Sequence, residues 1–217
     1  MTDWVTISSL ATAGGTLVLA VATFSSVRSA NRAARTAERS LLVGMRPVLI
    51  PSREDDPVDR VRFGDDHRIE IPGHGGVVEV ANGKVYTGVG LRNAGSGLAV
   101  IHGWYAQPYD PAAPAPPPGP EDFHRQQLDL YIPAGADGYW QGAIRDQEDK
   151  QLAPMSAAID SGQRIIIDLM YGDHEGGQRA IARFSLVVGD IEKGRYSNVL
   201  RYWSLDNDDP RDREGQR

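Results

Sequence analysis

The pattern of apolar and polar positions changes twice along the chain and divides it into three parts. Residues 4–24 form a mostly apolar run that contains no Asp, Glu, Lys or Arg. Residues 25–44 are rich in alanine and arginine and contain no proline. From residue 46 to residue 205, short apolar stretches alternate with Gly, Pro and Asn, a pattern that is typical of strands and turns. The sequence therefore predicts an N-terminal helix followed by a mainly β domain.

The uncharged run has the length of a transmembrane helix, since about 20 residues cross the apolar core of a bilayer. Trp4 at its start suits the membrane interface, and residues 1–3 then form a short N-tail. Two alternatives stay open. The small residues Ala20 and Ala22 fit a signal-peptide cleavage pattern, although no basic residue precedes the run. An apolar helix could also be buried in a protein core.

Small residues in the transmembrane segment would let a second helix approach closely. Ala11, Gly14 and Gly15 form this group, and Ala11 and Gly15 stand at small-xxx-small spacing. They predict a face for helix association, and hence a homo-oligomer as one outcome. The other interpretation is that small residues are common in transmembrane helices.

A stripe of four arginines follows the apolar run on the same helix: Arg28, Arg32, Arg35 and Arg39. Because positive charge stays on the cytoplasmic side, this stripe predicts a single-pass protein of the cell (inner) membrane. Its N-terminus would lie outside and its C-terminal domain in the cytoplasm. The stripe could bind anionic lipid or act only as the flank that stops transfer. A separate apolar seam on this helix could instead pair helices; it consists of Val27, Ala30, Ala34, Ala37 and Leu41. Gly44 and the Arg46-Pro47 pair then end the helix.

Residues 46–205 are expected to fold as an antiparallel, Ig-like β-sandwich of about eight strands, with a barrel as the alternative. A short helix is expected within residues 146–161, a proline-rich loop at 108–120 and a disordered charged tail at 206–217. The strand candidates are 48–50, 58–63, 67–71, 77–80, 84–92, 98–107, 127–132, 139–144, 164–171, 179–188 and 198–205.

Turn residues and strand periodicity add detail to this prediction. Asn82-Gly83 is a strong hairpin signal, because both residues tolerate a positive φ. A second strand–turn–strand unit is expected around Asn93, Gly95 and Gly97. Because side chains alternate along a strand, the strand 98–107 should have one face with Val100, His102 and Trp104 and another with Ile101 and Tyr105.

The sequence resembles a loosely defined set of uncharacterised bacterial membrane-anchored proteins. The resemblance rests on Arg46-Pro47-Val48-Leu49 after the helix, on the L-x-N-x-G-x-G-x-A pattern from Leu91 to Ala99, and on Tyr171-x-Asp173-x-x-Gly176. Leu98 stands where the family pattern usually has proline. The resemblance implies an anchor and a β-sandwich that carries this turn, and it implies no catalytic residues.

Charge and composition exclude several classes of function. The net charge is −6, and because residues 1–50 are positive, the β domain is more acidic than this figure. An acidic domain repels phosphate backbones, so no nucleic-acid partner is expected. The chain has no cysteine, which excludes disulfides and thiolate metal sites.

No motif predicts catalysis, a cofactor or a metal. Neither G-x-x-x-x-G-K nor G-x-G-x-x-G occurs. Ala94 stands two residues before Ser96, where a nucleophile elbow requires glycine. The five histidines are scattered. Two of them lie in acidic segments, Asp65-Asp66-His67 and Asp173-His174-Glu175, that could supply ligands but are more typical of solvated turns.

The hypothesis that follows is a membrane-anchored, non-catalytic module that binds another protein near the membrane. Two alternatives remain. One is a homo-oligomeric membrane effector or pore-associated subunit, since Thr12, Thr16 and Thr23 place hydroxyls in the span. The other is a membrane-tethered hydrolase, which would require a pocket of clustered Asp and His residues.

Overall fold

The computed structural model describes residues 4–112, 116–187 and 196–206, except for the side chains of residues 4–9, 11 and 39. The predicted N-tail (1–3), most of the predicted tail (207–217) and the side chains of Ala11 and Arg39 therefore lie outside the described part. The chain divides into two compact units, Met1–Gly44 and Met45–Arg217.

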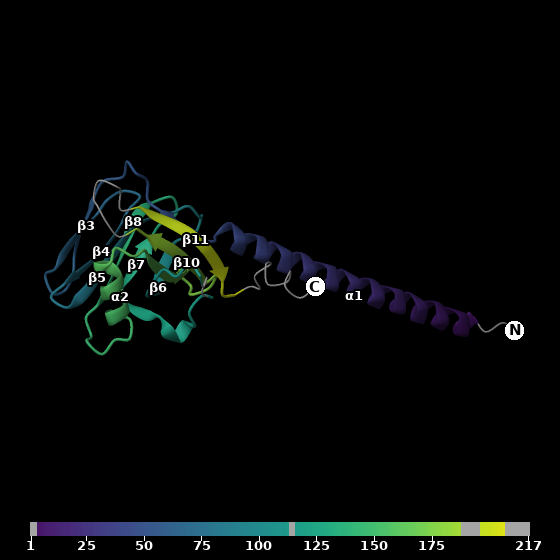
Figure 1. The fold of residues 1–217 in the computed structure, drawn as a ribbon. Helices are drawn as coiled ribbons and strands as arrows, with labels where there is room; N and C mark the ends of the chain where they lie inside the picture. The colour runs from purple at the N-terminus through teal and green to yellow at the C-terminus, as the bar shows by residue number, and fades with distance from the viewer. Residues whose placement is uncertain (1–3, 113–115, 188–195, 207–217) are drawn as a thin grey trace. The chain divides into compact units, whose positions relative to one another are not determined.

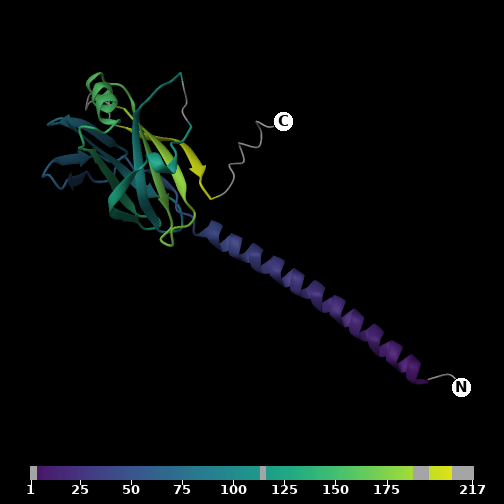
Figure 2. The same cartoon turned by 90° about the horizontal axis from the view of Figure 1, so that it is seen from below.

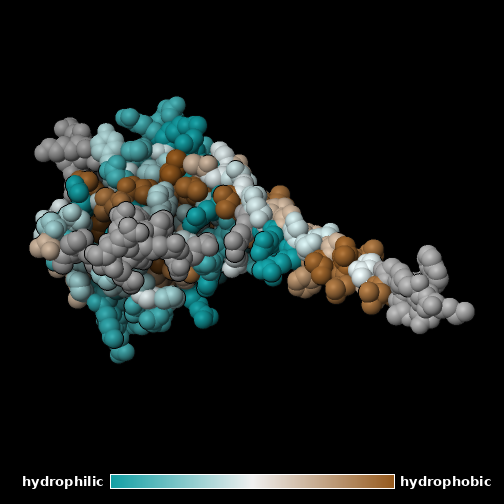
Figure 3. All heavy atoms as spheres, turned by 90° about the vertical axis from the view of Figure 1, so that its right-hand side faces the viewer, coloured by the Kyte–Doolittle hydropathy of each residue, from teal (hydrophilic) through white to brown (hydrophobic). Residues whose placement is uncertain are grey.

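The first unit is one continuous helix, α1 (Trp4–Gly44). Two hydroxyl groups in its apolar part bond to the helix backbone: Thr16 donates to the carbonyl oxygen of Thr12 and Thr23 to that of Leu19, each at 2.8 Å. The helix ends before Arg46-Pro47, where proline disfavours a helical conformation of the preceding residue. Figure 3 shows apolar side chains along its N-terminal part. Among the residues whose side chains are described, no helix is both long enough and apolar enough to cross a membrane.

The second unit contains two main antiparallel sheets and a separate hairpin. In the first sheet, strand β5 (Lys84–Asn93) pairs with each of the other three strands. These are β1 (Leu49–Pro51), β4 (Gly76–Ala81) and β8 (Asp137–Ile144). The second sheet has the order β11 (Ser197–Ser204), β10 (Ala180–Leu186), β9 (Ile165–Gly172), β6 (Ala99–Pro108) and β7 (His124–Ile132). The hairpin is formed by β2 (Asp59–Arg62) and β3 (Arg68–Ile71).

The main hydrophobic core is shared by the two sheets and a short helix, α2 (Leu152–Asp160). Fully buried side chains from the first sheet, such as Trp140, join Phe184 of the second sheet and Met155 of α2. A smaller cluster joins the β2–β3 hairpin to the first sheet through Phe63 and Tyr86. In Figures 1 and 2 the strands β3, β4 and β5 accordingly lie on one side of the unit and β10 and β11 on the other.

The expected faces of β6 are wrong. The register of β6 shifts between Ile101 and Gly103 against both of its neighbours, which leaves His102 as the extra residue of a bulge. A bulge reverses the alternation beyond it. Ile101 and Trp104, which simple alternation places on opposite faces, therefore belong to the same buried core, with exposures of 1% and 4%.

The predicted fold class is confirmed at the level of a mainly β protein with antiparallel sheets and an N-terminal helix. The described residues contain one strand at each of the predicted strand candidates, and the predicted helix within 146–161 is present as α2. Strand β7 begins at His124, three residues before its predicted start. Asp206, assigned from the sequence to the tail, accepts hydrogen bonds from the backbone and side chain of Arg179.

Candidate functional site

The candidate site is a groove of about 270 Å³ between β7 and β8. These strands follow each other in the chain, yet β7 pairs with β6 in the second sheet and β8 pairs with β5 in the first. The two sheets therefore separate along these strands and leave an opening. Residues that line it include Phe63, His124, Arg125, Gln126, Gln141 and Arg145.

Part of β7 lies outside the ladder that holds the rest of the strand. Leu130, Tyr131 and Ile132 are in register with Ile101, Val100 and Ala99, and the register resumes only at Arg125 and Gly103. Residues 126–129 are thus skipped by the pairing, and Gln126, Gln127 and Leu128 line the groove. Leu128 is 69% exposed.

Trp104 lines the groove and packs against the fully buried Trp140. The rings of Trp104 and Trp140 lie 5.4 Å apart, and Trp104 stacks on His124 at 4.4 Å. They pack over the backbone at Gly142, where an added Cβ would lie 2.5 Å from a Trp140 ring carbon and 2.9 Å from a Trp104 ring carbon. The Trp140 indole nitrogen donates to Gln126 Oε1 at 3.1 Å, which ties the two walls together.

Two polar atoms in the lining are buried without a hydrogen-bond partner among the described residues: His124 Nε2 and Gln141 Oε1. The nearest acidic group to His124 Nε2 is Asp149 Oδ2 at 3.5 Å, which is too long for a strong hydrogen bond. Buried polar groups are normally paired with protein or with water. These two atoms of the groove are therefore available to form hydrogen bonds with a ligand.

One wall carries a compact network around the carboxylate of Asp65. This carboxylate accepts hydrogen bonds from Tyr86 Oη at 2.6 Å, from Lys84 Nζ at 3.0 Å and from Arg145 Nε at 3.3 Å. These hydrogen bonds lower the pKa of Asp65 well below its usual value, and the bond from Tyr86 has the largest effect. Burial, with the bond to Asp65, raises the pKa of Tyr86 to about 12.

The groove lining is positively charged. Arg145 lies over the ring of Phe63, with its Cζ 5.6 Å from the ring centroid, and Arg125 is exposed. The described residues of the lining include no Asp or Glu. Since three donors already surround the nearby carboxylate of Asp65, the groove favours a ligand that carries negative charge.

The predicted turn residues Asn93, Gly95 and Gly97 clamp the start of the β unit. Asn93 Oδ1 accepts from the backbone nitrogens of Val48 and Gly95, and its Nδ2 donates to the carbonyl oxygens of Gly97 and Ile132. A Cβ on Gly95 would lie 2.2 Å from the Arg46 oxygen, and one on Gly97 would lie 1.8 Å from the Met45 oxygen. The turn thus holds residues 45–48 directly.

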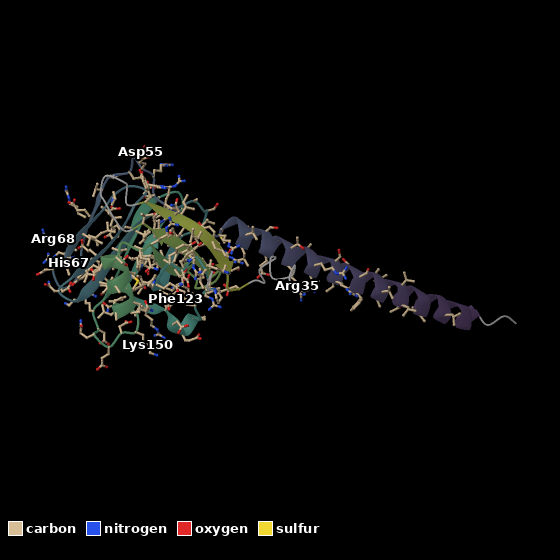
Figure 4. The ribbon with its side chains drawn as sticks, viewed as in Figure 1. Arg35, Asp55, His67, Arg68, Phe123 and Lys150 are labelled. Atoms are coloured by element: carbon tan, nitrogen blue, oxygen red, sulfur yellow. The ribbon has the colours of Figure 1, made fainter. Side chains whose placement is uncertain are left out.

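The other predicted site residues are dispersed. Asn82 and Gly83 form the two-residue connection of β4 and β5, with φ of 52° and 71°. Gly14 and Gly15 have open space where a Cβ would stand. Along α1, Arg28, Arg32 and Arg35 line a shallow hollow with Phe24 and Val27, and Figure 4 labels Arg35.

The structure separates the histidines that the sequence left as metal candidates. His67 contacts Glu79 and stacks on Tyr86, whereas His174 lies 4.0 Å from Glu175 on an exposed turn. Within the described residues no group of three or more His, Asp or Glu side chains could hold a metal ion.

Sequence reasoning did not find the groove residues Arg125, Gln126 and Gln141. One signal was present: residues 124–129 are polar except for Leu128 and lack the alternation of a strand with one buried face. Several aromatic side chains of the β unit are internal: Trp140 is fully buried, and Tyr139 and Tyr202 pack against the two hydrophobic clusters.

The chain matches no protein-family model and no curated protein sequence.

Proposed function

We propose that this protein is a membrane-tethered, non-catalytic interaction module that binds a segment of another protein in the β7–β8 groove. The observation that carries the proposal is the groove itself. It lies where the two sheets separate, and it contains strand residues that the β6 register skips and two buried polar atoms without hydrogen-bond partners among the described residues. In this proposal the two sheets form an Ig-like sandwich whose open edge is the binding site.

The proposed anchor is the uncharged run of residues 4–24 in α1, of which residues 4–9 and 11 have no described side chains. Support comes from the internal hydrogen bonds of Thr16 and Thr23, because a bilayer core offers no other partner for a hydroxyl. The arginine stripe that follows would place the β unit in the cytoplasm, next to anionic lipid.

The groove chemistry supports binding over hydrolysis. His124 and Asp149 resemble part of a general-base pair, but their closest atoms are 3.5 Å apart. Among the described residues, no Ser, Thr, Cys, Lys or Tyr lines the groove that could act as a nucleophile. What it offers are amide groups, arginines and aromatic rings, which are groups that bind polypeptide.

Cross-linking in intact cells tests the proposed site, and the cysteine-free chain makes it simple. Leu128→Cys places a photoactivatable maleimide probe in the groove, and Val58→Cys places it at another exposed apolar position. We expect one dominant partner to be captured from position 128 and not from position 58. Equal capture from both positions would contradict a specific groove.

A second candidate function is a homo-oligomeric membrane effector. It is favoured by the open space around Gly14 and Gly15, where a second helix could approach the backbone. Gly14→Ile with Gly15→Ile would block this approach. A change in oligomer size in detergent would support the candidate, and an unchanged monomer would rule it out.

A further inference from the structure

We infer that the groove binds an extended segment of the partner protein, which pairs through its backbone with residues 126–129 of β7 and places a carboxylate beside Arg125 and Arg145. This inference rests on the proposed function and specifies the mode of binding and the chemistry of the segment.

The first support is the part of β7 that the register with β6 skips. Residues 126–129 are assigned to the strand but have no partner residue in that register. Unpaired strand backbone next to a groove is the template that extended peptides use when they add to a sheet.

The second support is the pair of unpartnered polar atoms. Gln141 Oε1 is an acceptor, and His124 Nε2 can act as donor or acceptor according to its tautomer. An extended polypeptide presents an N–H and a C=O at nearly every residue. One such segment can therefore satisfy both atoms, whereas an apolar ligand would leave both of them unpaired.

The third support is charge. Arg125 is exposed, and the described residues give it no ion-pair partner, while Arg145 uses its Nε for Asp65. Within the described part of the chain, no acidic residue lines the groove. A guanidinium group binds a carboxylate through paired, charge-assisted hydrogen bonds, so an Asp or Glu side chain, or a C-terminal carboxylate, fits this end of the groove.

The test uses the full chain in mild detergent and a displayed library of random linear peptides as the probe. Arg125→Gln removes the proposed carboxylate contact. Arg68→Gln is the matched control, because Arg68 is an exposed arginine on β3 and lies well apart from Phe123, which precedes β7 (Figure 4). Peptides that bind the unmodified chain are then synthesised with single backbone N-methyl groups.

We expect the selected peptides to share one acidic position and to bind Arg125→Gln about fivefold more weakly. Binding to Arg68→Gln should be unchanged. N-methylation should weaken binding about tenfold at alternate residues only, because alternate N–H groups of a strand face the same neighbour.

Three results would overturn the inference: no selected peptides, peptides without a shared acidic position, or equal sensitivity to methylation at every residue. A cross-linked dimer of this chain from Leu128→Cys would also overturn it, since the occupant would be a second copy. If capture of one partner from position 128 persists in any of the first three cases, the proposed function stands and only the strand mode fails.

Discussion

The side-chain nitrogen of Asn93 donates a 2.9 Å hydrogen bond to the carbonyl oxygen of Ile132, the last residue of β7. The same side chain accepts from the backbone nitrogen of Val48 at 3.1 Å. One buried amide therefore joins the start of the β unit to the strand that borders the groove. Asn93 thus connects the turn predicted from the sequence to strand β7 of the candidate site, although no sequence motif spans the two.

Asn93→Ala should lower the free energy of unfolding by about 3 kcal/mol, because it leaves several buried backbone groups without a partner. Urea unfolding of the full chain in detergent measures the change. Asn198→Ala, at an exposed position of β11, should change it by less than about 0.5 kcal/mol. Equal effects would contradict the role given to Asn93.

Gly97→Ala should destabilise the β unit by about 3 kcal/mol or more, since the new methyl group would lie 1.8 Å from the Met45 oxygen. Gly64→Ala is the control, because a Cβ there meets nothing within 4 Å. Thermal unfolding of both variants checks the difference. A Gly97→Ala protein as stable as the control would show that residues 45–48 do not need the turn.

Arg183 and Asp168 form a buried ion pair on neighbouring strands, with two hydrogen bonds of 2.7 Å. Burial raises the pKa of Asp168 and the bonds from Arg183 oppose this shift. Asp168→Leu or Arg183→Met alone should cost about 3 kcal/mol, because each leaves one charge buried. The double variant should cost less than the sum. Additive costs in urea unfolding would mean that the pair does not act as a unit.

Acid should weaken the attachment of the β2–β3 hairpin through Asp65. The pKa of Asp65 is lowered in the folded protein, so its contribution to stability is present above the unfolded pKa of about 4 and is lost as pH falls. Asp65→Asn should therefore be less stable than the unmodified protein at neutral pH. The difference should shrink progressively below about pH 4. A difference that is independent of pH would contradict the network around Asp65.

The parts of the fold that the sequence predicted are those set by local chemistry. The Asn82-Gly83 signal coincides with a two-residue turn at positive φ. The mostly apolar strand β10 is buried at every residue, and its sequence identifies it as a strand without any knowledge of its neighbours. Such elements depend on the conformations and burial of their own residues.

The groove could not be predicted because it depends on pairing between distant segments. The bulge at His102 reverses the face on which Trp104 lies, and nothing in the local period marks it. The skipped residues 126–129 are recognisable only once the register of β6 and β7 is known. The assignment of β7 and β8 to different sheets is likewise a property of the whole unit.

The central claim is that α1 anchors a cytoplasmic β unit, and the most direct test is labelling of a single cysteine in intact cells. Ser96→Cys places an exposed thiol in the β unit of an otherwise cysteine-free chain, and a membrane-impermeant maleimide reports its accessibility. We predict that the protein stays in the membrane pellet after carbonate washing and that the thiol is labelled only after lysis. A chain released from the pellet, or a thiol labelled before lysis, would contradict the account.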